Sequence, residues 1–335
     1  MIDGRQVTDA HMHVPRLSTV TPAWLDWAQQ YGKDSPWRSV FDIAGDPVPA
    51  RLDALLATEG VDQALLFAEY SPLSTGIQPI EDLLPIIEHN PVRFHLVANV
   101  NPAVHPRPAA EAARQLALGA VAVKVHPVHG AFRPDTSQMY DVYDLCAQRN
   151  VPVIVHTGPS IFPGSVAEAG DPKLLDKVTA DFPNVLFVLA HGGRGSWYDD
   201  AATMALTRQN VWLDIAGLPP KRLPQYYAAF DLAELARTWI FGTDWPGGPG
   251  VAANVRAIAA LGLPDDILSG VLSGSAQRVY LRALPPVSRQ QPLQQHDFRV
   301  IEFRGERQPP DMVPGHGDGL LRRPQLLAEP DVLLG

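Results

Sequence analysis

The chain has 335 residues and a formal net charge of −9, and 46% of its residues are hydrophobic and 19% are charged. This composition is typical of a globular protein, and the acidic balance argues against nucleic-acid binding, which needs a basic face. The 33 prolines are about twice the usual ~5% share, which excludes a long-helix or coiled-coil protein because proline breaks helix interiors.

The cysteine count and the hydropathy pattern limit the setting of the protein. A single cysteine, Cys146, excludes intramolecular disulfides and a thiolate metal cage. It lies in the helix-like stretch MYDVYDLCAQRN, so we expect a buried, inert thiol. No apolar run approaches ~18 residues, and the first residues lack the apolar core of a signal peptide. We therefore expect a soluble, cytoplasmic protein without a membrane partner.

Short apolar, β-branched runs recur along most of the chain, each followed by turn residues, as in strands that are buried on both faces. There are eight of them, over 7–14, 61–68, 93–100, 120–127, 151–158, 184–193, 210–217 and 239–246. Between and after them, apolar residues at three- and four-residue spacing predict helices. These cover 47–60, 80–90, 108–119, 139–150, 171–182, 199–210, 251–262 and 275–284. Such alternation predicts an α/β fold, the (β/α)₈ TIM barrel, over residues 1–284.

Two segments depart from this alternation. Residues 14–50 hold Trp24, Trp27 and Trp37 and are expected to form a long loop or small subdomain over one end of the barrel. Residues 285–335 contain eight of the prolines and little periodicity, so we expect an irregular C-terminal extension. We expect it to be flexible or to pack on its own or a neighbouring barrel.

Active sites of such barrels form at the carboxyl ends of the strands. Polar residues end most of the predicted strands, namely His11, His13, Lys124, His126, His156, His191 and Asp244. His11 and His13 are two positions apart, so strand alternation places both imidazoles on one face. Two convergent imidazoles are half of a site for Zn²⁺, Mn²⁺ or Fe²⁺. With His156 and Asp244 at later strand ends, the pattern predicts a mononuclear metal centre.

The motifs DAHMH, VKVHP, VIVHTG, LAHGG and FGTDWP, in this order, resemble the amidohydrolase superfamily. The closest branch is the amidohydrolase-related group that includes aminocarboxymuconate-semialdehyde decarboxylase and related hydratases and lactonases, and the resemblance covers residues 1–284. It implies one divalent metal, zinc with manganese or iron as alternatives, and a hydrogen bond from His191 to the metal-bound water or substrate. The implied metal ligands are His11, His13, His156 and Asp244.

Asp244 and Lys124 are further candidate catalytic residues. Asp244, beside a metal-activated water, can take a proton and later deliver it to a leaving group. Its alternative role as a helix N-cap does not explain why histidines converge on the same rim. By resemblance, a carboxylated Lys124 could bridge a second metal, and a buried amine that contacts a substrate carboxylate is the alternative. We expect one metal.

The substrate is expected to be a small molecule that bears a carboxylate. Arg194, in GGRGSWYDD, suits an anionic group because guanidinium binds carboxylates in a bidentate fork. Trp197 and Tyr198 either wall a planar substrate or pack on the barrel. Trp245 is expected to line the pocket and His126 to contact substrate, whereas His129 is expected to be solvated.

Three functional hypotheses follow. The first is a metal-dependent hydrolase of a small ester, lactone or amide, with metal-bound hydroxide as the nucleophile. The second is a non-oxidative decarboxylase of an aromatic or unsaturated acid, in which Asp244 protonates the carbon that loses CO₂. The third is a non-catalytic binding or assembly barrel with the tail as a docking arm. A homodimer is an option that the sequence leaves open.

Overall fold

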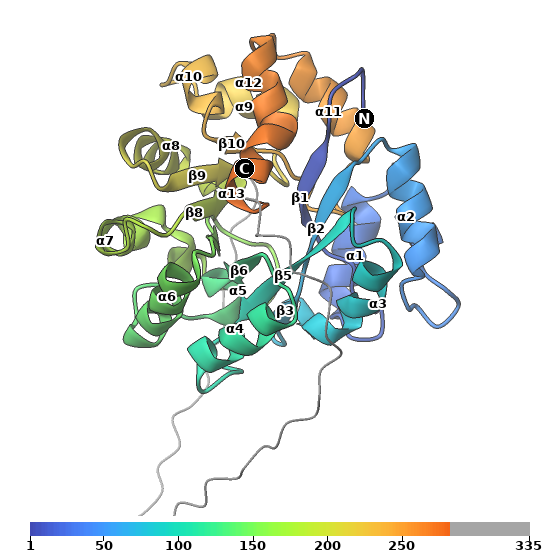
Figure 1. Ribbon diagram of the computed structural model, residues 1–335, viewed down its shortest axis with the longest axis horizontal. Coiled ribbons are helices and arrows are strands. Elements are labelled where there is room, and N and C mark those ends of the chain that lie inside the picture. Colours follow the sequence, from blue (N-terminus) through green and yellow to red (C-terminus); the bar gives the residue numbers. More distant parts are fainter. Residues whose placement is uncertain (282–335) are drawn as a thin grey trace, which may run out of the picture. The chain divides into compact units, whose positions relative to one another are not determined.

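The computed structural model describes residues 1–281 (Figure 1). The strands are β1 (Thr8–Met12), β2 (Gln63–Phe67), β3 (Glu69–Ser71), β4 (Gly76–Gln78), β5 (Phe94–Val100), β6 (Ala122–Val125), β7 (Val153–His156), β8 (Phe187–Ala190), β9 (Val211–Asp214) and β10 (Trp239–Ile240). Within the described residues, eight of them form a parallel sheet in the order β1-β2-β5-β6-β7-β8-β9-β10. The predicted eight-stranded fold is therefore confirmed.

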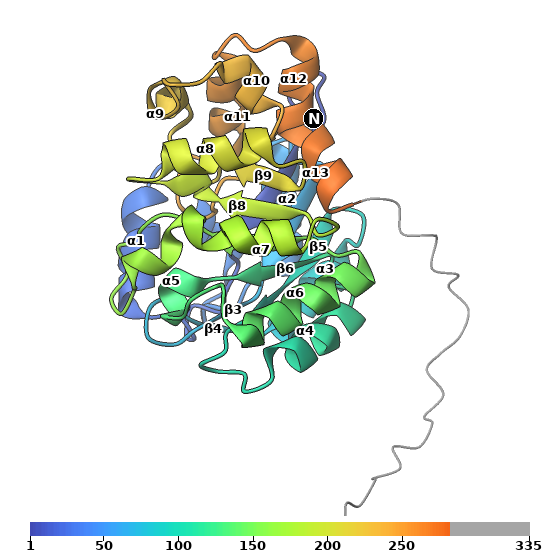
Figure 2. The ribbon, with the colours of Figure 1, turned by 90° about the vertical axis from the view of Figure 1, so that its left-hand side faces the viewer.

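The α-helices surround these strands (Figures 1 and 2). They are α1 (Pro22–Tyr31), α2 (Pro49–Thr58), α3 (Leu84–His89), α4 (Pro108–Ala117), α5 (Pro127–Gly130), α6 (Ser137–Arg149), α7 (Asp176–Asp181), α8 (Tyr198–Thr207), α9 (Leu223–Tyr226), α10 (Leu232–Ala236), α11 (Val251–Ala259), α12 (Asp265–Ser269) and α13 (Ser275–Val279). A π-helical turn, Gly270–Gly274, joins the last two.

Hydrogen bonds between β1 and the segment after β10 close the sheet into a TIM barrel. The amide of Ala10 donates to the carbonyl of Phe241 at 3.0 Å. The amide of Asp244 donates to the carbonyl of His11, also at 3.0 Å. The amide of His13 donates to the carbonyl of Trp245 at 2.9 Å. Two of the predicted strand ends, His11 and Asp244, are thereby brought side by side although they are more than 230 residues apart.

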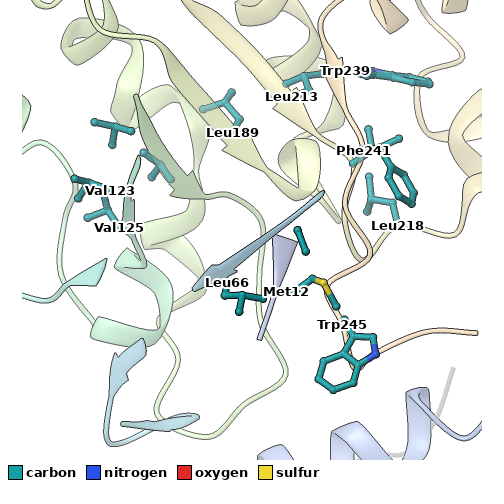
Figure 3. Packing of buried hydrophobic residues seen from close by; sticks show 14 of the residues in the cluster. Met12, Leu66, Val123, Val125, Leu189, Leu213, Leu218, Trp239, Phe241 and Trp245 are labelled. Carbon is teal, nitrogen blue, oxygen red and sulfur yellow. The ribbon is translucent and has the colours of Figure 1, made fainter. Parts of the chain in front are cut away.

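Alternation along the strands sorts side chains into two cores. Leu65 and Phe67 of β2 lie in the cluster that fills the barrel, whereas Leu66 between them packs outward against the helices. The same alternation in β6 directs Val123 and Val125 outward. Figure 3 shows outward-packing residues of this kind, among them Met12, Leu66, Val123, Val125, Leu189 and Leu213.

An irregularity in β1 determines where its histidines point. The register between β1 and β2 shifts between Asp9 and Met12, and a bulge of this kind changes which face a residue occupies. Ala10 belongs to the barrel-filling cluster and Met12 to the outer one. The rings of His11 and His13 both lie against Phe67 of the interior, with centroids 4.4 and 5.5 Å from its ring.

The C-terminal helices close the amino-terminal end of the barrel. Ala276 and Val279 of α13 pack on the barrel-filling cluster. The hydroxyl of Ser273 lies 2.9 Å from that of Thr8, the first residue of β1. Because this end is plugged, a site that opens to solvent is left to the carboxyl ends of the strands.

Helix α6 illustrates how the sequence forms the outer layer. Its buried residues recur at helical spacing and face the sheet, and they are Met139, Val142, Tyr143 and Cys146. The helix ends at Asn150, which adopts a left-handed conformation with φ of 53°, a common helix C-terminus. Cys146 is fully buried, as the sequence predicts.

Several elements lie outside the predicted strands and helices. The segment 14–50 carries α1 and a short 3₁₀ helix, Trp37–Val40. β3 and β4 pair as an antiparallel hairpin after β2, and α9 and α10 follow β9. The predicted extension 285–335 lies outside the described residues. Within residues 1–281, no helix is long and apolar enough to cross a membrane.

Candidate metal centre

A cavity of about 810 Å³ opens at the carboxyl ends of the strands. Loops after β1, β2, β7, β9 and β10 contribute to its walls. Its ionisable lining residues are His11, His13, Glu69, His126, His129, His156, His191, Arg194, Lys221 and Asp244. The structure therefore brings most of the predicted site residues to one cavity, which is the usual position of an active site in this fold.

His11 is oriented by a carboxylate that the sequence analysis did not single out. Its Nδ1 donates to Asp214 Oδ2 at 2.5 Å, and both side chains are about 1% exposed. Burial holds the pKa of His11 well below its usual value, so the ring is neutral. The proton on Nδ1 leaves Nε2 with a free lone pair, which is the arrangement found in carboxylate–histidine–metal triads.

Asp244 lies against both histidines of β1. Its Oδ1 is 3.6 Å from His11 Nε2 and 3.5 Å from His13 Nε2. Burial alone would raise the pKa of Asp244, but a hydrogen bond from His13 and the nearby rings of His191 and His11 hold it well below the usual range. The carboxylate is therefore ionised at neutral pH and faces the imidazole nitrogens of both residues.

His191 completes a group of donors. Its Nδ1 donates to the carbonyl of Ala216 at 2.7 Å, which leaves Nε2 unprotonated in the neutral ring. Ligand atoms of His11, His191 and Asp244 all lie within 4.8 Å of one another. His191 and Asp244 both have left-handed backbones, with φ of 65° and 62°, a conformation that is uncommon outside glycine and frequent at functional sites.

This donor set fits a divalent cation. Among the described residues, His11 Nε2 and both ring nitrogens of His156 are buried without a hydrogen-bond partner, and such unpaired polar atoms are costly unless a ligand satisfies them. Imidazole and carboxylate are ligands of zinc, manganese and iron. The identity of the metal is not fixed by this set, so the expectation of zinc stays a prediction.

His156 adjoins His191, with ring centroids 4.6 Å apart, and belongs to a stack of imidazoles. The ring of His126 lies 4.0 Å from that of His156 and 3.5 Å from that of His129, in near-parallel planes. The Nε2 of His129 bonds Ser160 Oγ at 2.7 Å. The expectation that His129 is solvated is wrong: it is 7% exposed, because the short helix α5 turns its side chain back over the barrel.

Lys124 is buried beneath the cavity and does not line it. Its Nζ lies 5.1 Å from the centroid of the Phe67 ring and has no hydrogen-bond partner among residues 1–281. Burial lowers the pKa of Lys124 to about 8, although Asp214 and Asp244 partly oppose the shift. Contact between this amine and a substrate in the cavity is therefore not supported.

Arg194 and Asp244 converge beside Gly217, which follows β9. A β-carbon on Gly217 would lie 2.9 Å from Asp244 Oδ2 and 3.4 Å from Arg194 Nη1, and its φ is +68°. Only glycine leaves this space open. Arg194 also donates from Nη2 to the carbonyl of Pro159 at 3.3 Å. An anion-binding group is thus placed next to the buried carboxylate.

Three predicted substrate contacts are absent from the cavity wall that the described residues form. Trp197 precedes α8, and Tyr198 begins it and stacks on Tyr226 with centroids 4.5 Å apart. Trp245 is 3% exposed and packs in the outer core near Met12 and Phe41 (Figure 3). For Tyr198, the stacking on Tyr226 favours the alternative that it packs on the barrel. The expectation that Trp245 lines the pocket is wrong, because its ring packs in the outer core.

Asp214 and Glu69 are site residues that the sequence analysis missed. Asp214 ends the seventh predicted strand, so the rule that selected His191 would have selected it too. Glu69 follows the second strand directly, lines the cavity and is 7% exposed. Burial raises the pKa of Glu69. A search for every ionisable residue at a strand end would have found both.

The amidohydrolase family model matches residues 8–282, so the chain belongs to the amidohydrolase family. This confirms the resemblance predicted from the motifs and the expectation of an enzyme rather than a non-catalytic barrel. No curated protein sequence matches the chain.

Solved structures share the fold at low identity. An uncharacterised TIM-barrel protein from Bordetella bronchiseptica has 22% identity and a TM-score of 0.67, over 82% of this chain and 98% of that one. A dihydroxybenzoic acid decarboxylase from a Polaromonas species, with bound manganese and 2-nitroresorcinol, has 16% identity and a TM-score of 0.63 over 83% and 97%. A probable 2-pyrone-4,6-dicarboxylic acid hydrolase from Acinetobacter baumannii, with bound citric acid, has 15% identity and a TM-score of 0.57 over 82% and 99%.

Proposed function

We propose that the protein is a metal-dependent, non-oxidative decarboxylase of an aromatic or unsaturated 2-hydroxy acid. The observation that carries this proposal is the convergence of Arg194 and Asp244 on the space beside Gly217. A carboxylate bound by Arg194 lies next to Asp244, so the carbon that bears it is the one that Asp244 can reach. The manganese-containing dihydroxybenzoic acid decarboxylase with the same fold supports this choice.

The metal would be held by residues drawn from two sets. His11, His191 and Asp244 form the group whose ligand atoms gather, and His13 and His156 adjoin it. The first set contains His191, to which the family resemblance gives a hydrogen bond to the metal-bound water or substrate. Which of these histidines bind the metal and which only form hydrogen bonds is therefore part of the proposal. When bound, a divalent ion supplies a Lewis acid that polarises substrate oxygens.

The chain's own residues account for the proton movements. Arg194 binds and orients the substrate carboxylate. Asp244, ionised in the free site, accepts the proton that the substrate hydroxyl releases on binding. It returns this proton to the carbon that bears the carboxylate, where a π pair of the substrate forms the new C–H bond. The carbon–carboxylate bond then breaks, its electron pair restores the π system, and CO₂ leaves. The product oxygen then takes one proton from water.

The experiment compares CO₂ release with acid release. Metal-replete protein is incubated with salicylate-type acids and separately with lactones of similar size. The proposal predicts CO₂ from the acids, lost in Asp244→Asn and Arg194→Lys, and no ring opening of the lactones. Hydrolysis of lactones without CO₂ release from any hydroxy acid would contradict it.

Metal-dependent hydrolysis of a small ester, lactone or amide is the second candidate. The observation in its favour is the buried amine of Lys124, which has no hydrogen-bond partner in the described part of the chain. A carboxylated lysine at this strand end would bridge a second metal, and a metal pair suits attack by hydroxide. Two metal ions per chain, with one lost in Lys124→Met, would favour hydrolysis over decarboxylation.

A further inference from the structure

The cavity is much larger than its reactive floor requires. Its volume of about 810 Å³ lies in the upper part of the range of ~300–1,000 Å³ in which proteins enclose drug-sized ligands. The imidazoles, Arg194 and Asp244 occupy the carboxyl ends of the strands, and the remaining walls come from loops and helices above them. These outer walls indicate what the rest of the substrate is like.

One outer wall is made of large apolar rings. Trp24 and Trp27 of α1 face the cavity together with Ile161 and Phe162 from the loop after β7. The rings of Trp27 and Phe162 meet edge to face with centroids 5.8 Å apart. Ile161 is 71% exposed. Two segments far apart in sequence thus form a continuous aromatic surface.

A second part of the wall is made of small residues. Ala253 and Ala257 lie one helical turn apart on α11 and both line the cavity, with Ile258 beside them. Alanines at this spacing present a shallow apolar groove. Longer side chains at these two positions would fill part of the cavity.

Few of the described residues that line the cavity carry a charged side chain. Glu69, Arg194 and Asp244 belong to the floor, and Lys221 is exposed on the loop after β9. The remainder of the cavity, here called the channel, is lined without any other Asp, Glu, Lys or Arg, so an apolar group would be stabilised by burial in it. A carboxylate on Arg194 would direct the remainder of an acid into this channel.

We infer that the substrate is an arylcarboxylic acid with a second ring or an extended hydrocarbon group, which lies between Trp27 and the alanines of α11. This inference rests on the proposed function for the placement of the carboxylate at Arg194. It adds a specificity-determining surface, defined by Trp27, Phe162, Ala253 and Ala257, to the reactive centre.

Binding of unreactive acids tests the inference without turnover. Benzoate, 4-hexylbenzoate and biphenyl-4-carboxylate are titrated calorimetrically into metal-replete and metal-free protein. Burial of a second ring or six methylene groups predicts that both larger acids bind at least roughly 30-fold more tightly than benzoate. Equal affinity of the three acids, or binding of none of them, would overturn the inference.

Two kinds of variant locate the apolar group. Ala257→Leu fills the channel without leaving a hole, and it should reduce the advantage of biphenyl-4-carboxylate to less than about fivefold while benzoate changes by less than about twofold. The matched control is Ala260→Leu, at an exposed position just after the same helix. Trp27→Ala should act in the same direction, with Trp197→Ala as its control. A loss shared equally by all ligands, or by the controls, would contradict the placement.

The outcome separates this inference from the proposed function. Selective binding of the larger acids, with no CO₂ released from any hydroxy acid, would support the apolar channel and contradict the decarboxylase activity. CO₂ release that does not depend on the size of the acid, with equal affinities for the three unreactive acids, would support the decarboxylase activity and contradict the apolar channel.

Discussion

The two sides of the site hold their imidazoles in different ways. On the β1 side, each histidine faces a carboxylate: His11 donates to Asp214, and His13 lies 3.5 Å from Asp244. On the side of β6 and β7, His126 is stacked between His129 and His156. Both sides are buried in the same cavity, so the difference lies in the partners of the rings.

The comparison indicates a division of labour. A carboxylate fixes the tautomer of a histidine and increases the basicity of its free nitrogen, which favours metal ligation. Burial lowers the pKa of both His126 and His129, and the nearby Lys124 lowers both further. The stacked side is therefore a neutral wall. His156 belongs to the stack, yet its two nitrogens are unpaired within residues 1–281, so it lies on the boundary.

The largest loss of turnover is expected on substitution of Asp244, the ionised carboxylate that faces the histidines of the β1 side. Asp244→Asn keeps the size of the side chain but removes the ionised group that faces His11 and His13. We expect turnover to fall by roughly 10³-fold or more, because proton transfer and metal charge balance are both lost. Steady-state kinetics and elemental analysis of the same preparation measure it. Turnover within about tenfold of the wild type would contradict the role given to Asp244.

Asp214 tests whether the carboxylate behind His11 matters. Asp214→Asn should weaken metal binding by roughly 10–100-fold, as for other residues that orient metal ligands. Competition with a chelator gives the affinity, and Asp181→Asn, which changes an exposed carboxylate bonded to Lys177 and Tyr140, is the control. Unchanged affinity in Asp214→Asn would show that the His11–Asp214 pair is structural only.

Two glutamine variants test which of the stacked histidines belong to the metal site. His156→Gln is expected to weaken metal binding by at least roughly tenfold, because a ligand is lost. His126→Gln is expected to change it by less than about threefold, since Nδ1 of His126 is already used by the amide of His129 at 3.1 Å. If both variants lose metal equally, the stack is part of the metal site and the comparison fails.

The last prediction concerns packing rather than the site, at Cys146 on α6. Burial raises the pKa of its thiol to about 12, and only the thiolate reacts with thiol reagents. At pH 8 the native protein should therefore react at least roughly 10³-fold more slowly with a disulfide reagent than the unfolded protein, which should release one equivalent. Rapid reaction of the native protein would mean that α6 opens readily.

Much of the barrel could be predicted because burial on both faces leaves a strong pattern. The eight strands are short apolar runs with turn residues after them, and most catalytic candidates stand at the ends of those runs. The β3–β4 hairpin was missed because it is three residues per strand, too short for a periodic signal. The inward orientation of both His11 and His13 depends on a register shift that pairing, not composition, determines.

The roles of individual loop residues were harder to predict. Trp245 follows Asp244 directly in sequence, but its ring packs in the outer core near Phe41. His129 was expected in solvent, yet α5 folds it against His126. In each case the direction of a side chain depends on tertiary packing, which local sequence does not encode.

The count of metal ions per chain, in the wild type and in two variants, tests the central claim most directly. Elemental analysis after dialysis should find about one divalent ion per chain in the wild type and in His126→Gln, and almost none in Asp244→Asn. No divalent ion in the wild type, or an ion retained by Asp244→Asn and lost from His126→Gln, would contradict a metal centre on the β1 side.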